Sequence, residues 1–125
     1  MSASRKTVLI ADDDPILRSL LRETLGRRRF RLLEAADGLE AVSISRRERP
    51  DLIVLDLIMP GQDGRAVCQA LKSDPSTSAI RIIVLTGGEL PEHEGGEAPT
   101  APDEILTKPF SPRELLDTIH RLLAE

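Results

Sequence analysis

Short runs of aliphatic residues alternate along the chain with segments whose apolar positions recur every three to four residues. The short runs are typical of buried strands, and the three-to-four spacing is typical of amphipathic helices. Strands and helices that alternate with short connections predict an α/β fold, with a doubly wound parallel sheet covered by helices on both faces. The predicted strands are residues 7–11, 30–35, 51–56, 80–86 and 104–107, and the predicted helices begin at residues 15, 38, 65 and 112.

Two of the predicted helices have well-defined starts. Asp14 precedes Pro15, which places a capping carboxylate before a proline at the first helical position. Ser111 and Glu114 form a capping box around another such proline at the start of the last helix. The apolar residues expected to face the core are Ile16, Leu17, Leu20, Leu21 and Leu25 in the first helix, Leu39, Ala41 and Val42 in the second, and Leu115, Leu116, Ile119, Leu122 and Leu123 in the last.

The stretch GGELPEHEGGEAPTAPDE, residues 87–104, breaks this alternation. It contains three prolines and six carboxylates, with no Lys or Arg. An unbroken helix through its prolines and glycines would cost about 12 kcal/mol relative to alanine. We therefore expect an irregular loop here.

Length and composition limit the classes of protein that are plausible. A chain of 125 residues favours a single domain, with its core within about 6–124. A net charge of −4 gives no bulk attraction to nucleic acid or to anionic lipid, so we expect no direct contact with either. No apolar run approaches the ~20 residues that span a membrane. The single cysteine, Cys68, cannot form an internal disulfide and is expected in the core, which favours a cytoplasmic location.

Polar side chains follow four of the predicted strands at their carboxyl ends, where ligands bind in open parallel sheets. Asp12 and Asp13 follow the first strand, Asp56 ends the third, Thr86 ends the fourth, and Lys108 follows the fifth. Carboxylates that lie within a few ångströms of one another ionise together only with a cation between them. Mg²⁺ prefers such oxygen ligands, and a lysine and a hydroxyl could hold a phosphoryl group beside it.

Other residues of these types have simpler interpretations. Asp14 is expected to be a helix cap rather than a metal ligand. The two histidines, His93 and His120, lack metal-ligand spacing and are expected at the surface. Each strand-end residue taken singly would also be a cap, a turn residue or a solvated charge. The prediction of a phosphoryl site depends on their convergence at one edge of the sheet.

The chain resembles the receiver domain of bacterial response regulators, the CheY-like module that sensor histidine kinases phosphorylate. The resemblance covers roughly residues 6–124. It implies a flavodoxin-like sheet with strand order 2-1-3-4-5. Its motifs are VLIADDDP (8–15), DLIVLDLIMPGQDG (51–64), IVLTG (83–87) and LTKPF (106–110).

The resemblance implies a role for each strand-end residue. Asp56 matches the phosphoacceptor, and Thr86 and Lys108 match the hydroxyl and the amine that contact the phosphoryl group. Gly87 would offer a backbone N–H to the same group. Pro109 occupies the position of an expected cis proline.

The resemblance also implies a Mg²⁺ site. Asp13 matches the direct ligand of the acidic pair, and Asp12 its partner acting largely through water. Asp56 is a further ligand. Ile58 matches the position whose backbone carbonyl binds the metal.

Two departures from the family pattern bear on signalling. Ile105 occupies the position of an aromatic switch residue, so a switch of that type is not available. The irregular stretch 87–104 occupies the place of the family's fourth helix.

The implied partners are a sensor histidine kinase or phosphotransfer protein and an unknown downstream protein. The domain would be no enzyme beyond its self-catalysed phosphotransfer and autodephosphorylation. An aspartyl phosphatase would carry a second Asp where Ile58 stands. A pseudo-receiver, a protein–protein scaffold that is never phosphorylated, remains the alternative. Sequence alone does not distinguish a stand-alone regulator from part of a longer protein.

Overall fold

The computed structural model describes residues 5–26, 29–57, 64–87 and 102–124. Its five strands form one parallel sheet in the order β2-β1-β3-β4-β5, which confirms the predicted fold class. The strands are β1 (Lys6–Ala11), β2 (Phe30–Ala35), β3 (Leu52–Asp56), β4 (Arg81–Thr86) and β5 (Glu104–Thr107). The helices in the described part of the chain are α1 (Pro15–Leu25), α2 (Gly38–Glu48), α3 (Gly64–Lys72) and α4 (Pro112–Leu123).

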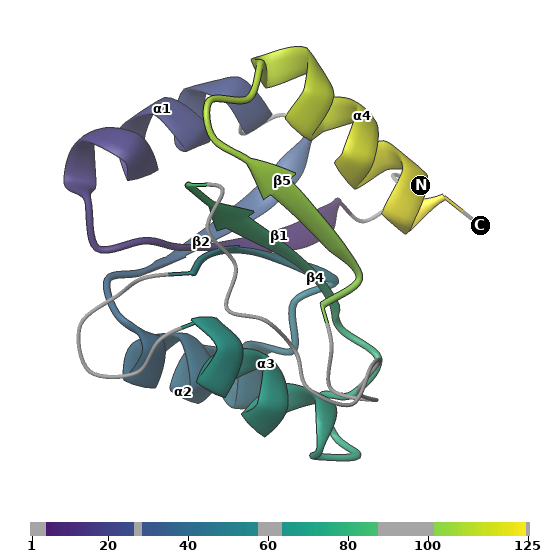
Figure 1. Ribbon diagram of the computed structural model, residues 1–125. Coiled ribbons are helices and arrows are strands. Elements are labelled where there is room, and N and C mark those ends of the chain that lie inside the picture. The colour runs from purple at the N-terminus through teal and green to yellow at the C-terminus, as the bar shows by residue number, and fades with distance from the viewer. Residues whose placement is uncertain (1–4, 27–28, 58–63, 88–101, 125) are drawn as a thin grey trace, which may run out of the picture.

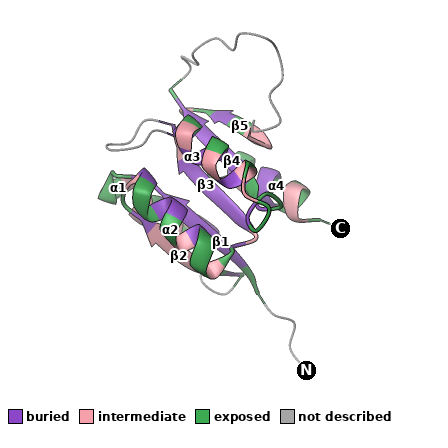
Figure 2. Cartoon of the chain, turned by 90° about the horizontal axis from the view of Figure 1, so that it is seen from below, coloured by how far each residue is buried: buried purple, intermediate pink, exposed green. Residues whose placement is uncertain are grey.

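The helices cover both faces of the sheet (Figure 1): α1 and α4 lie on one face, and α2 and α3 lie on the other. Successive strand residues point to opposite faces, so each central strand supplies two cores. In β3, Leu52 and Val54 pack with α1 and α4, and Ile53 and Leu55 pack with α2 and α3. The central strands are accordingly buried along most of their length (Figure 2).

Three of the expected core positions are wrong. Ile16 is 78% exposed, Leu20 is 55% exposed and Leu39 is 65% exposed. In α1, the face directed at the sheet is centred on Leu21 and Leu25, and Ile16 and Leu20 lie about 100° or more around the helix from that face. Leu39 is displaced by a similar angle from the buried face of α2. The rotation of each helix about its axis therefore differs from the one that its apolar residues suggested.

The predicted helix starts are confirmed by hydrogen bonds. The Ile16 N–H donates to Asp14 Oδ1 at 2.9 Å, and the Glu114 N–H donates to Ser111 Oγ at 3.0 Å. Each bond satisfies a backbone donor that has no partner within its helix. These caps fix the points at which α1 and α4 leave the carboxyl edge of the sheet.

Gly64 allows α3 to begin directly against the end of β3. A Cβ at this position would lie 2.9 Å from the Asp56 carbonyl oxygen and 2.9 Å from the Leu57 Cα. The Gly64 N–H also donates to the Leu57 carbonyl at 2.6 Å. Only a residue without a side chain fits this close approach of two backbones, which holds the backbone around Asp56 in place.

Cys68 and His120 lie where the sequence predicted. Cys68 is buried on α3, and burial raises the pKa of its thiol to about 12, so the thiol stays protonated. His120 is exposed on α4, and His93 lies outside the described residues. No helix in the described ranges has the length and apolar character needed to cross a membrane.

The predicted irregular loop falls largely outside the described residues, because the structure does not describe 88–101. The absence of a regular fourth helix in that stretch therefore stays a prediction. The last residues of the stretch are described. Asp103 lies just before β5, and Glu104 is the first residue of that strand, as predicted for residues 104–107.

Candidate functional site

The register of the sheet brings the carboxyl ends of four strands together. Ala11 pairs with Leu55, which places Asp12 and Asp56 one residue further along neighbouring strands. Thr86 pairs with Thr107 at the ends of β4 and β5. The Lys108 N–H donates to the Thr86 carbonyl at 2.7 Å and extends this pairing by one residue. The residues that the sequence singled out therefore follow adjacent strands at one edge.

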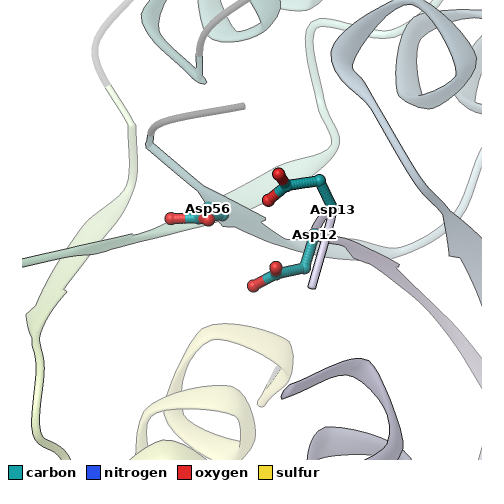
Figure 3. Close-up of side chains that lie close together, drawn as sticks. All are labelled: Asp12, Asp13 and Asp56. Atoms are coloured by element: carbon teal, nitrogen blue, oxygen red, sulfur yellow. The ribbon is translucent and has the colours of Figure 1, made fainter. Parts of the chain in front are cut away.

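Three carboxylates gather at this edge (Figure 3). Asp12, Asp13 and Asp56 each offer an oxygen, and these oxygens lie within 4.8 Å of one another. Asp12 is buried, Asp56 is half-buried and Asp13 is exposed. Ile58, whose carbonyl the resemblance adds to this group, lies outside the described residues.

Most of the polar groups of Asp12 already have partners. Its N–H donates to the Ala35 carbonyl at 3.1 Å, and its Oδ1 accepts from the Asp14 N–H at 2.8 Å. Its Oδ2 is buried and has no hydrogen-bond partner among the described residues. The pKa of Asp12 is raised to about 6, chiefly by burial, with smaller upward contributions from the negative charges of Asp56 and Asp13 and downward ones from the Asp14 N–H and Lys108.

Of the other strand-end residues, Lys108 contacts Asp56 directly. Lys108 Nζ lies 3.4 Å from Asp56 Oδ1, at the limit of a hydrogen bond. Thr86 is buried at the end of β4, and Gly87 is exposed beside it. The peptide bond between Lys108 and Pro109 is cis, as the resemblance implied.

This arrangement suits a hard divalent cation. Three carboxylates converge, and one of them, Asp12, has a buried oxygen without a hydrogen-bond partner among the described residues, which is costly unless a cation or a proton satisfies it. Mg²⁺ takes a few carboxylates and completes its shell with water and phosphate. An amine beside the half-buried Asp56 can pair with an added anionic group. The residues present therefore fit a magnesium ion and a phosphoryl group.

Without divalent cations, the free energy of unfolding is expected to rise by about 1.4 kcal/mol between pH 7.5 and pH 5 because of Asp12. Its pKa is about 6 in the folded state, against an ordinary value near 3.9 in the unfolded chain. The folded state thus binds the proton more tightly, and this stability is lost as the pH rises through 6. Urea unfolding followed by circular dichroism in EDTA measures the effect.

Asp12→Asn is the control for this pH dependence, and the variant should lack the rise. An equal rise in both proteins would contradict the assignment to Asp12. Two partly exposed carboxylates, Glu48 and Asp74, do not interfere in this window. Hydrogen bonding from Arg31 lowers the pKa of Glu48, and hydrogen bonding from Ser76 lowers that of Asp74, so both lose their contribution only at more acidic pH.

An arginine that was not predicted from the sequence also contacts this site. Arg18 Nη1 donates to the backbone carbonyl of Asp12 at 2.6 Å. Glu34 on β2 pairs with Arg18 and also with Arg22, one turn further along α1. The available signal was the spacing of the two arginines on one helical face, which a solvated surface explains equally well.

Known proteins agree with this fold. A family model described as response regulator receiver domain matches residues 8–120. The chain belongs to the response regulator receiver domain family. Receiver domains of this kind act in two-component signalling, where response regulators interact with histidine kinases.

Individual relatives support the assignment. The transcriptional regulatory protein ResD of Bacillus subtilis is 39% identical over 116 residues, which are 93% of this chain and 47% of ResD. The chemotaxis response regulator CheY4 of Vibrio cholerae superposes with a TM-score of 0.85 at 30% identity, covering 96% of this chain and all of CheY4. The receiver domain of the sensor histidine kinase PA1611 of Pseudomonas aeruginosa superposes with a TM-score of 0.84 at 25% identity, covering 98% of this chain and all of that domain.

The relatives also bear on the expected partners and cofactor. The chain spans about half the length of the curated relatives it matches, and ResD is named a transcriptional regulator. That name stands in mild conflict with the expectation of no nucleic-acid contact. The PA1611 receiver domain holds a magnesium ion in its active-site cleft.

Proposed function

We propose that this chain is the phosphoacceptor of a two-component phosphorelay, and that Asp56 receives the phosphoryl group. The observation that carries the proposal is the meeting of Asp56 with Asp12, Asp13 and Lys108 at one sheet edge. The donor would be a phosphohistidine on a sensor histidine kinase or a phosphotransfer protein. The phosphorylated state would then change the binding of a downstream protein.

The carboxylates of Asp12, Asp13 and Asp56, with the Ile58 carbonyl, would hold Mg²⁺. When bound, the ion neutralises negative charge on the transferring phosphoryl group. Three observations support this part of the proposal: the oxygens within 4.8 Å, the unpartnered Asp12 Oδ2, and the magnesium in the PA1611 receiver domain.

In the transfer, a carboxylate oxygen of Asp56 attacks the phosphorus. The phosphorus–nitrogen bond of the donor breaks, and its electron pair returns to the histidine ring. The product is a mixed anhydride of the Asp56 carboxyl and phosphate. Lys108 would move from the Asp56 oxygen to a phosphoryl oxygen, while the Thr86 hydroxyl and the Gly87 N–H would donate to the others.

Phosphorylation would be transmitted to the downstream protein without an aromatic switch residue. Ile105, in the position of that residue, is 38% exposed on β5. Lys108 is bonded through its backbone to Thr86, so movement at the phosphoryl group would reach β4 and β5 together. A downstream protein that binds at the carboxyl ends of β4 and β5 would therefore change its affinity on phosphorylation.

Phosphorylation is expected when the protein is incubated with Mg²⁺ and acetyl phosphate or phosphoramidate. Intact mass spectrometry should show an adduct of about 80 Da on the wild type. Asp56→Asn should show none, because an amide is a poor nucleophile for this transfer, and EDTA should suppress the wild-type adduct. No adduct on the wild type, or an equal one on Asp56→Asn, would contradict the proposal. The first result would favour a pseudo-receiver scaffold.

A further inference from the structure

Arg18 reaches from α1 back to the loop that holds the metal-binding carboxylates. Its Nη1 donates to the Asp12 carbonyl at 2.6 Å, a charge-assisted hydrogen bond across six residues of sequence. The Arg18 side chain is only 21% exposed. This contact ties the first helix to the backbone of Asp12 itself.

Glu34 holds the Arg18 guanidinium from the other side. Glu34 Oε1 lies 3.4 Å from Arg18 Nε, and Oε2 accepts from Arg22 Nη1 at 2.7 Å. Glu34 is on β2, the strand whose last residue, Ala35, accepts from the Asp12 N–H. Asp12 is therefore fixed between two elements, by β2 at its N–H and by α1 at its carbonyl.

Only one polar atom of Asp12 is left without a partner among the described residues. Its N–H, carbonyl and Oδ1 are bonded to Ala35, Arg18 and Asp14, and Oδ2 is buried without a partner. A residue held at three points presents its fourth polar atom in one direction. We propose that Arg18 is a positioning residue, which orients Asp12 for a divalent cation. The proposal rests on the magnesium site of the proposed function.

An electrostatic role and a positioning role of Arg18 predict opposite changes in cation affinity when the arginine is replaced. A positive charge near a cation site repels the cation, so loss of that charge alone should tighten binding. Loss of a group that orients a ligand should weaken binding, and such outer contacts typically contribute 10–100-fold in metal affinity. The sign of the change therefore separates a positioning role from an electrostatic one.

The experiment compares Mn²⁺ and Mg²⁺ affinities of the unphosphorylated wild type, Arg18→Met and Arg22→Met. Electron paramagnetic resonance measures free Mn²⁺ directly, and Mg²⁺ is titrated in competition. Arg18→Met is expected to bind both ions about tenfold more weakly. Arg22 carries the same charge one turn further along the helix but does not contact Asp12. The affinity of Arg22→Met for both ions should therefore be within about twofold of the wild type, or higher.

A third variant keeps the positive charge at this position. Arg18→Lys carries its donors on a single nitrogen at the end of a shorter side chain instead of on a planar fork, so we do not expect it to hold the carbonyl and Glu34 in the same geometry. Its affinity is expected to lie between those of the wild type and Arg18→Met. Because Arg18→Lys retains the charge and most of the aliphatic part of the side chain, it can replace Arg18→Met in the affinity comparison if that variant does not fold.

The outcomes separate this inference from the proposed function. If Arg18→Met and Arg18→Lys bind as tightly as the wild type and only unfold more easily, Arg18 is merely structural and the inference fails alone. Tighter binding by Arg18→Met would make its role electrostatic and would also overturn the inference. If the wild type binds neither ion, the magnesium site of the proposed function fails, and the inference fails with it.

Discussion

Asp103→Ala is expected to lower the free energy of unfolding by about 3 kcal/mol, a large fraction of a domain's stability. Asp103 Oδ2 accepts from Lys72 Nζ at 2.9 Å and from the Ile82 N–H at 2.8 Å. Lys72 is only 11% exposed, so removal of the carboxylate leaves a nearly buried charge without its counterion. Chemical unfolding followed by circular dichroism measures the loss.

Glu104→Gln is the matched control for Asp103→Ala. Glu104 is the next residue, and its ion pair with Arg121 at 2.9 Å is largely exposed, so its loss should cost less than about 1 kcal/mol. The double variant Lys72→Met, Asp103→Ala should recover part of the stability, because the unpaired charge is then absent. Equal losses for Asp103→Ala and Glu104→Gln would contradict the importance of this pair. The pair anchors the chain where it re-enters the sheet before Lys108.

Asp13→Asn is expected to lower Mg²⁺ affinity at least a hundredfold. Asp13 supplies one of three carboxylate oxygens that lie within 4.8 Å of one another. Two unit charges about 4 Å apart near a protein surface attract by about 4 kcal/mol, and each 1.4 kcal/mol is tenfold in affinity. Exposure of Asp13 screens part of this, so a hundredfold is the lower bound. Titration by calorimetry or by competition with Mn²⁺ measures the change.

Asp14→Asn tests whether the loss of Mg²⁺ affinity in Asp13→Asn comes from a defined metal site or from the summed negative charge of the loop. Asp14 carries the same charge one residue further on, but its Oδ1 caps α1 by accepting from the Ile16 N–H. Asparagine caps a helix as well as aspartate does, so the fold should be kept. The variant should change Mg²⁺ affinity by less than about threefold. Similar losses for Asp13→Asn and Asp14→Asn would point to a diffuse acidic field and against a defined metal site.

Most of the fold could be predicted because its signals are local. The central strands are buried on both faces and read as continuous aliphatic runs, and Asp14 and Ser111 are caps that mark helix starts. The gathering of Asp12, Asp13 and Asp56 could be predicted for a topological reason. Parallel strands end at one edge, so residues at their carboxyl ends meet even when they are far apart in sequence.

The remainder depends on contacts that no short stretch encodes. Lys72 and Asp103 lie 31 residues apart, and their pairing requires the packing of α3 against the starts of β4 and β5. Arg18 lies on a helix whose rotation the apolar pattern gave incorrectly, since Ile16 and Leu20 are exposed. With that rotation wrong, the direction of the Arg18 side chain could not be predicted either.

The position of the phosphoryl group tests the central proposal most directly. After incubation with Mg²⁺ and a small-molecule phosphodonor, hydroxylamine converts an acyl phosphate to a stable hydroxamate, which tandem mass spectrometry assigns to one residue. We expect the hydroxamate at Asp56, and at no residue when EDTA replaces Mg²⁺. A hydroxamate at Asp12 or Asp13, or none on a folded protein that binds Mg²⁺, would contradict the assignment of Asp56 as phosphoacceptor.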